Sequence, residues 1–238
     1  MLFIDNYIST NRAYSIYYII NGIAVLIGFY LGVKAKSINL GLFFLVPVAV
    51  FYFYSLKYKR LFLWGNIAVA FLTASLIMLV WIFEFFIIKR NEIMFTEGLQ
   101  VYWIISYFIL SYSFFAFITT LLREIIKDIE DMEGDSKWGC TTLPIVVGRE
   151  KAKRIAAIIS LIGAISVIFF QFKLKIINME YLAYLLIIVV QIPYLYLAIK
   201  LWKATEKEDF VFLGNFSKIL ILLGILTMIG VKYSIELW

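Results

Sequence analysis

A dense group of acidic residues lies in the middle of the chain, in the stretch "REIIKDIEDMEGDSKWG" at positions 123–139. Six of the sixteen acidic residues fall within it: Glu124, Asp128, Glu130, Asp131, Glu133 and Asp135. Successive residues of a helix are rotated by about 100°, so four of these six would share an arc of roughly 60°. The four are Glu124, Asp128, Asp131 and Asp135, whereas Glu130 and Glu133 would point elsewhere.

Carboxylates stacked on one helix face repel each other, and a bound cation would offset that repulsion. Because the chain has no histidine, oxygen ligands would have to hold the cation, and such ligands favour Mg²⁺. Mg²⁺ is typically held by one or two carboxylates together with phosphate oxygens and water. Arg123 and Lys127 lie close enough in the sequence to contact a diphosphate on such an ion. The alternative is a solvated helix end of mixed charge that binds no ligand.

The rest of the chain is strongly hydrophobic and predicts an all-α, polytopic membrane protein. Hydrophobic residues make up 63% of it and charged residues 16%, whereas soluble domains have about 45–50% and about 25%. Several apolar runs approach or exceed the roughly 20 residues that span a bilayer. Since no polar stretch is long enough for a separate soluble domain, we expect one membrane-embedded domain over residues 1–238.

Seven hydrophobic segments are expected to span the membrane as helices. They are Tyr14–Val33, Leu40–Tyr54, Leu61–Ile88, Leu99–Leu122, Ile155–Phe172, Tyr181–Leu201 and Phe216–Tyr233. Pro193 is expected to kink the sixth segment, and residues 1–12 are expected to form a loop.

The basic residues predict how these spans are oriented. Fifteen of the 22 Lys and Arg residues fall on one side of the predicted spans and seven on the other. The positive-inside rule then places the acidic stretch on the cytoplasmic side of a bacterial or archaeal cell membrane. Because the basic residues lie between apolar runs, we interpret the net charge of +6 as membrane topology rather than as nucleic-acid binding.

With the residues that follow it, the acidic stretch resembles the second aspartate-rich motif of the UbiA superfamily of intramembrane prenyltransferases. The resemblance rests on Asp128, Asp131 and Asp135, followed by Gly139, Thr142, Leu143 and Pro144. It implies a helical bundle of nine spans that transfers a polyprenyl chain from its diphosphate to an acceptor. It also implies that these three aspartates hold the Mg²⁺ ion. The wording "REIIKDIEDMEGD" is most similar to the digeranylgeranylglyceryl phosphate synthase branch.

A second stretch, "FYSLKYKRLFLWGNIAVA", is also similar to the superfamily, whose members carry a Tyr, then basic residues, then Gly-Asn at the start of a helix. The matching residues are Tyr54, Lys57, Lys59, Arg60, Gly65 and Asn66. Cations beside Mg²⁺ would stabilise a departing diphosphate. The alternative is an ordinary basic loop at the membrane surface, and the sequence does not say whether Lys57 or Lys59 faces the site.

The superfamily has a first acidic motif, an Asn followed by aspartates at four-residue spacing, and no such pattern occurs in this sequence. The first predicted span matches the third family helix, so the seven spans correspond to helices three to nine. Residues 1–12 then match the loop after the first motif, which favours an N-terminally shortened chain over a divergent family member. We expect weak or no transfer by this chain alone.

The resemblance therefore implies an Mg²⁺-dependent prenyltransferase in the membrane. The expected donor is a polyprenyl diphosphate, which the resemblance suggests is geranylgeranyl diphosphate. The expected acceptor is a lipid, which the resemblance suggests is a prenylglyceryl phosphate. An aromatic acceptor, as in quinone biosynthesis, is the alternative within this class. A non-catalytic lipid-binding or transport protein is the alternative of another class. Transporters place polar residues near the bilayer midplane, whereas the charges here cluster at one face.

Overall fold

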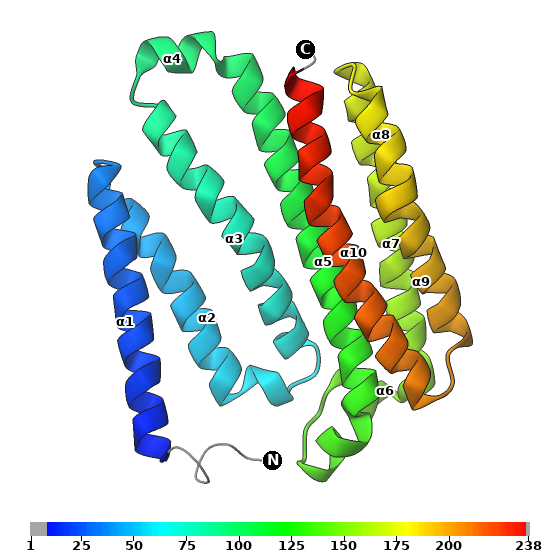
Figure 1. Ribbon diagram of the computed structural model, residues 1–238. Helices are drawn as coiled ribbons and strands as arrows, with labels where there is room; N and C mark the ends of the chain where they lie inside the picture. The colour runs from blue at the N-terminus through cyan, green and yellow to red at the C-terminus, as the bar shows by residue number, and fades with distance from the viewer. Residues whose placement is uncertain (1–8, 237–238) are drawn as a thin grey trace. The chain divides into compact units, whose positions relative to one another are not determined.

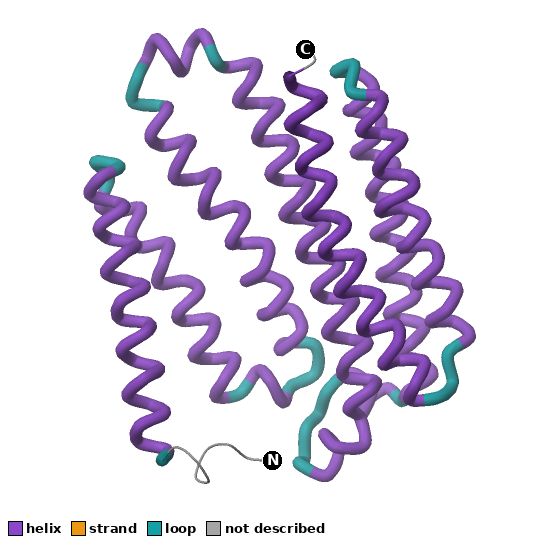
Figure 2. The backbone as a smooth tube through the Cα atoms, in the orientation of Figure 1, coloured by secondary structure: helices purple, strands orange, loops and turns teal. Residues whose placement is uncertain are grey.

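A computed structural model describes residues 9–236, and within this range the backbone is helical and contains no β-strand (Figures 1 and 2). The long helices include α1 (Thr10–Lys34), α3 (Trp64–Ile88), α5 (Leu99–Lys137) and α7 (Arg149–Ile176). The other helices are α2 (Leu45–Leu56), α4 (Glu92–Glu97), α6 (Leu143–Val147), α8 (Glu180–Leu186), α9 (Ile192–Lys203) and α10 (Lys207–Glu236). Two 3₁₀ segments, Ile38–Phe44 and Tyr58–Arg60, and one π-helical segment, Ile187–Gln191, connect them.

The seven predicted spans are confirmed, since the described residues contain seven helical segments long and apolar enough to cross a membrane. Most of their ends differ from the prediction. The first helix begins at Thr10, so the end of the loop expected over residues 1–12 is helical instead, and residues 1–8 of that loop lie outside the described part. The second span begins with a 3₁₀ turn because Pro47 follows it and lacks the N–H needed to extend an α-helix backwards.

The fourth predicted span does not stop at Leu122 but continues as one helix through the acidic stretch to Lys137. Ten residues of α5 are buried, which gives this helix a packed face over much of its length. Gly134, which could loosen the last turn, lies inside the helix without ending it. The acidic stretch is therefore helical, as the shared arc of carboxylates requires.

The sixth span, where a kink was expected at Pro193, contains a π-helical segment. Residues Ile187–Gln191 take this wider form and end two residues before Pro193, whose ring cannot donate a backbone hydrogen bond. Gln191 donates to the backbone carbonyl of Ala164 on α7, at 3.4 Å between the nitrogen and the oxygen. The irregular segment is thus tied to its neighbour within the bundle.

The described chain divides into two compact units, each of which has its own packing. The first unit comprises the residues up to Phe53 together with Leu79–Ile105. Here α1 packs against the 3₁₀ segment that follows it, and two glycines of α1 allow the close approach. A Cβ atom at Gly28 would lie 2.4 Å from the ring of Phe44, and one at Gly32 would lie 3.1 Å from the backbone nitrogen of Gly41.

The second unit comprises Tyr54–Met78 and the residues from Ser106 on, and its core lies among α5, α7, α9 and α10. Tyr194 of α9 is fully buried; it accepts a hydrogen bond from Ser160 through its carbonyl oxygen and shares one with Thr119 through its hydroxyl. A buried lysine, Lys153, donates to the carbonyl oxygen of Ala204 at 2.7 Å and pairs with Glu150. These contacts hold α7 and α9 to α5.

The glycine at position 28 should be sensitive to substitution, because an added methyl group would collide with Phe44. We expect Gly28→Ala to lower the stability of the chain by about 1–3 kcal/mol through overpacking. Gly22, on the same helix, has no atom within 4 Å of its would-be Cβ. Gly22→Ala should therefore be neutral or stabilise by roughly 0.5–1 kcal/mol. Thermal unfolding of both variants in detergent would show a reversed order if α1 packs differently.

Candidate active site

The basic turn and the first residues of α3 are held close together by local backbone geometry. Leu63 has a φ of 56°, in the left-handed region that leucine rarely adopts, and turns the chain into α3. A Cβ at Gly65 would lie 2.9 Å from the carbonyl oxygen of Tyr58. Glycine is therefore needed at this position, and the next residue, Asn66, is 5% exposed on the inner face of α3.

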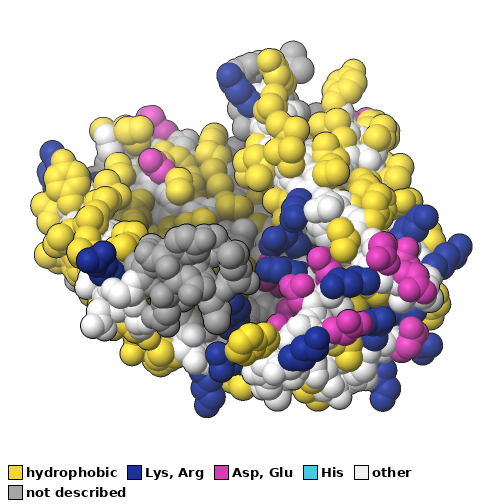
Figure 3. All heavy atoms as spheres, turned by 60° about the horizontal axis from the view of Figure 1, so that its bottom comes forward, with side chains coloured by type: hydrophobic (Ala, Val, Ile, Leu, Met, Phe, Trp, Pro, Cys, Tyr) yellow, Lys and Arg dark blue, Asp and Glu magenta, His cyan; other side chains and the backbone are white. Residues whose placement is uncertain are grey.

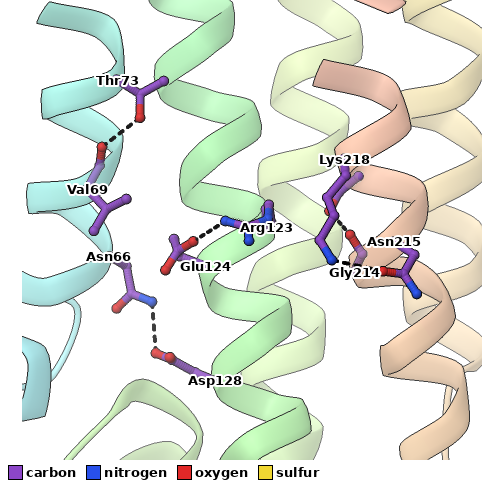
Figure 4. Close-up of polar contacts among 10 residues, drawn as sticks. Asn66, Val69, Thr73, Arg123, Glu124, Asp128, Gly214, Asn215 and Lys218 are labelled. Atoms are coloured by element: carbon purple, nitrogen blue, oxygen red, sulfur yellow. Dashed lines mark hydrogen bonds and ion pairs between the residues drawn. The ribbon is translucent and has the colours of Figure 1, made fainter. Parts of the chain in front are cut away.

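A hydrogen bond joins the two sequence motifs. The side-chain amide of Asn66 donates to a carboxylate oxygen of Asp128, at 2.8 Å between the nitrogen and the oxygen (Figure 4). Because the amide of Asn66 is buried, its position is fixed by packing, and the hydrogen bond in turn fixes the orientation of the half-buried Asp128 carboxylate. The contact connects residues 62 positions apart in the sequence.

A second contact joins the same two stretches through the backbone. Gly139, with a φ of 67°, reverses the chain after α5. The backbone N–H and the side-chain hydroxyl of Thr141 then both donate to the carbonyl oxygen of Arg60, at 2.8 and 3.0 Å. The basic turn is thus attached to the loop that follows the acidic helix. Thr142, Leu143 and Pro144 are buried behind this loop.

The carboxylates predicted for the site are surrounded by charges from both stretches. Asp128 interacts electrostatically with Asp135, Glu124 and Lys127. Asp135 interacts with the exposed Asp131 and with two lysines, Lys59 of the basic turn and Lys127 of α5.

Among the two candidate lysines of the basic turn, Lys59 is the one that interacts with Asp135, and Lys57 is not among the groups that act on either aspartate. Tyr54 is half-buried, and its phenol interacts with Glu124 and Asp128. Arg60 interacts with Cys140 in the loop after α5. The geometry therefore favours Lys59 over Lys57 as the lysine that faces the carboxylates.

Three other charged residues of α5, Arg123, Glu130 and Glu133, have neighbours of their own. Arg123 forms an ion pair with its neighbour Glu124, whose carboxylate points toward α3 (Figure 4). Glu133 pairs with Arg149 of α7 at 3.6 Å, and Glu130 lies against Gly214 of α10. The last two carboxylates thus point away from Asp128, as the helical spacing predicts.

The charged side chains gather at one end of the second unit. In Figure 3 acidic and basic side chains mingle where the lower ends of α5, α7 and α10 come forward, and hydrophobic side chains cover the surface beyond them. A charged end on an apolar bundle is the pattern expected of a site at the membrane surface, because ionised groups are costly in the hydrocarbon core.

An apolar cavity of about 290 Å³ lies in the second unit and was not predicted from the sequence. Its walls come from α3, α5, α7, the segment from α8 to α9, and α10. Thr120, the lining residue of α5 nearest to Asp128, precedes it by eight residues, or about 12 Å along the helix axis. The cavity therefore begins beyond Asp128, on the side away from the charged end.

Comparison with known proteins decides the family. The model of the UbiA prenyltransferase family matches residues 4–219. This chain belongs to the UbiA prenyltransferase family. Two relatives are named digeranylgeranylglyceryl phosphate synthase: one from Methanosphaera stadtmanae is 36% identical over 172 residues, and one from Pyrococcus abyssi is 34% identical over 137 residues.

These relatives are longer than this UbiA family member. The aligned part covers 71% of this chain and 54% of the Methanosphaera protein, and 58% of this chain and 41% of the Pyrococcus protein. The chain thus spans about half the length of the curated relatives it matches. A solved structure of digeranylgeranylglyceryl phosphate synthase in membranes superimposes with a TM-score of 0.62, at 23% identity, over 98% of this chain and 72% of the other. The fold is therefore that of the family.

The three aspartates of this family motif fit an Mg²⁺ ion only together with ligand oxygens. Among the residues that the structure describes, no group of three or more acidic or thiol side chains is gathered closely enough to hold a metal by itself. Asp128 and Asp135 are half-buried on one face of α5, two turns apart, and Asp131 is exposed between them in the sequence. One or two carboxylates with phosphate oxygens and water complete the usual Mg²⁺ shell, so the donor set suits a metal that arrives with a diphosphate.

The thiol of Cys140 offers a probe of this arrangement. Burial and the Asp135 carboxylate raise the pKa of Cys140, whereas Arg60 and Lys59 lower it. A raised pKa leaves less thiolate near pH 8, so alkylation by a maleimide should be slow and should accelerate as the pH rises. Asp135→Asn should increase the rate at pH 8, because it removes a charge that opposes thiolate formation. Glu133→Gln, on another face of α5, should leave the rate unchanged; equal effects of the two variants would contradict the placement of Cys140.

Proposed function

We propose that this chain is an intramembrane prenyltransferase that moves a geranylgeranyl group from its diphosphate to a prenylglyceryl phosphate. The observation that carries the proposal is the Asn66–Asp128 hydrogen bond, which joins the start of α3, after the basic turn, to the acidic helix, and an apolar cavity begins further along the same helices. A polyprenyl diphosphate has the same two parts, a highly charged head and a long apolar chain. The names of the relatives supply the chain type and the acceptor.

The charged head would be bound at the end of α5. Asp128, Asp131 and Asp135 would hold Mg²⁺ together with the diphosphate oxygens, and the bound ion would offset the charge that develops on the leaving group. Lys59 and Lys127 interact with Asp135, and Arg60 with the nearby Cys140, and all three would contact the diphosphate. Arg123, Tyr54, Asn66 and Lys57 complete the set expected from the sequence. Of these, Asn66 acts by orienting Asp128.

The transfer itself would need little covalent chemistry from the protein. The bond between the allylic carbon and the diphosphate oxygen breaks, and the electron pair leaves with the diphosphate. The acceptor hydroxyl oxygen then bonds to that carbon, and its proton passes to the released diphosphate. The cationic side chains Lys59 and Lys127 would stabilise the leaving group, and the apolar cavity would hold the prenyl chain.

The membrane placement follows from the same charges. The chain is an integral membrane protein with seven spans. We place the acidic end of α5 on the cytoplasmic side of the cell membrane, because most Lys and Arg residues lie at that end of the spans. A water-soluble diphosphate head and its Mg²⁺ ion would be available on that side.

Binding of geranylgeranyl diphosphate to the purified chain in detergent, with and without Mg²⁺, tests this proposal. We expect binding that is lost on chelation of Mg²⁺ and weakened about tenfold or more by Lys59→Gln, because a charge-assisted contact contributes about 1.5–3 kcal/mol. The matched control is Lys151→Gln, which replaces an exposed lysine of α7. This variant should bind the diphosphate as the wild type does. Binding that depends neither on Mg²⁺ nor on Lys59 would overturn the proposed site.

Transfer is measured with the same radiolabelled donor, offered with a prenylglyceryl phosphate or with an aromatic acid. We expect product from the glycerol-phosphate acceptor. Product only from the aromatic acid would reassign the acceptor. Tight binding without transfer to either acceptor would favour a lipid-binding role.

The cavity can be filled from Gly224, a lining residue of α10 whose would-be Cβ has no atom within 4 Å. Gly224→Leu should reduce the affinity for geranylgeranyl diphosphate at least about tenfold, since a pocket discriminates by this much against a few methylene groups. It should not reduce helix stability, because glycine is the poorer helix former. Gly22→Leu on α1 is the matched control, and its affinity should equal that of the wild type. Undiminished binding to Gly224→Leu would place the prenyl chain elsewhere.

A further inference from the structure

The end of the apolar cavity that lies farther from Asp128 is closed by aromatic side chains. Phe170 of α7, which is 3% exposed, forms the centre of this end. Its ring lies 5.3 to 6.3 Å, between ring centroids, from four rings of α5: Tyr107, Phe108, Tyr112 and Phe115. Edge-to-face and tilted aromatic pairs at these distances attract one another beyond their buried area.

The closed end is also fixed by a hydrogen bond between two helices. The hydroxyl groups of Tyr112 on α5 and Thr227 on α10 lie 2.8 Å apart, and both residues are buried cavity walls. A buried hydroxyl pair in apolar surroundings is costly to separate. Packing and this hydrogen bond thus both hold the aromatic end in place.

The length available to a ligand can be compared with the length of a prenyl chain. Tyr112 precedes Asp128 by sixteen residues on the uninterrupted helix α5, which corresponds to about 24 Å. A chain of four isoprene units has sixteen main-chain carbons and extends over roughly 20 Å, given carbon–carbon bonds of about 1.5 Å. With its first carbon near Asp128 and its last carbon in van der Waals contact with a ring, at roughly 4 Å, such a chain would end at the aromatic wall. A chain of five units, at roughly 25 Å, would overlap the wall.

We infer that the wall around Phe170 sets the length of the prenyl chain that this protein accepts, at four isoprene units. The inference rests on the proposed function and adds the residue that determines chain length. Chains of five units would have to displace the wall, whereas chains of three units would leave the far end of the cavity unfilled. Four units should bind most tightly for that reason.

The cavity also has exposed side walls, through which a longer prenyl chain could leave. Leu76 of α3 and Ile225 of α10 line the cavity and are 64% and 55% exposed. A longer chain could leave the bundle between such residues instead of pressing on Phe170. In that case substitutions at Phe170 would not change the order of chain lengths.

The test compares the binding of prenyl diphosphates of three, four and five isoprene units, in the presence of Mg²⁺, to wild type and to two variants. Phe170→Leu shortens the wall, and its neighbour Phe169, which is 69% exposed, supplies the matched control Phe169→Leu. We expect Phe170→Leu to improve the affinity for five units relative to four by about tenfold. The control should keep the wild-type order.

The possible outcomes separate the two hypotheses. An unchanged order of chain lengths in a folded Phe170→Leu variant, as judged by its thermal unfolding in detergent, would overturn the chain-length inference alone. A wild-type chain that binds none of the three diphosphates would overturn the proposed function together with the inference. Should Phe170→Leu not fold, Phe170→Met replaces the ring with an adaptable apolar side chain and is judged by the same order.

Discussion

The hydrogen bond from Asn66 to Asp128 is the interaction on which the candidate site depends. It joins the stretch that contains Asn66 to the acidic stretch. It also fixes the Asp128 carboxylate, which would otherwise be free to rotate. Its geometry requires Gly65, which lets α3 begin against the basic turn, and it requires α5 to continue as a helix to Asp128. The bond between Thr141 and the Arg60 carbonyl then holds the other side of the same junction. Lys59 and Asp135 are brought into mutual range as a result.

The distribution of polarity along the second unit follows from the cost of burying charge. Ionised groups remain at one end of the bundle, where water and counter-ions are available. Further along α5, beside the cavity, the hydroxyl of Thr119 pairs with Tyr194 of α9, and that of Tyr112 pairs with Thr227 of α10. A deeply buried lysine, Lys153, lies near the charged end and is bonded to a carbonyl and a carboxylate. A cavity surrounded by such walls is suited to an apolar ligand.

Much of this arrangement could be predicted from the sequence, because it depends on local periodicity. Hydrophobic runs predicted the seven spans, and the spacing of carboxylates predicted which of them share a face once α5 was taken to be helical. The face assignments of Glu130 and Glu133 follow from the same rotation. The choice of Lys59 over Lys57 could not be made, because it depends on a 3₁₀ turn whose orientation is set by Leu63 and Gly65. The apolar cavity could not be predicted either, since its walls come from segments that are distant in the sequence.

The central claim, that the basic turn and the acidic helix bind one Mg²⁺–diphosphate together, is tested most directly by a double-mutant cycle. The measured quantity is the Mg²⁺-dependent binding free energy of geranylgeranyl diphosphate for wild type, Lys59→Gln, Asp135→Asn and the double variant. If the two residues serve one site, the effects are not additive, and the coupling is at least about 1 kcal/mol. Additivity within about 0.5 kcal/mol would mean that the two stretches act independently, and it would contradict the account.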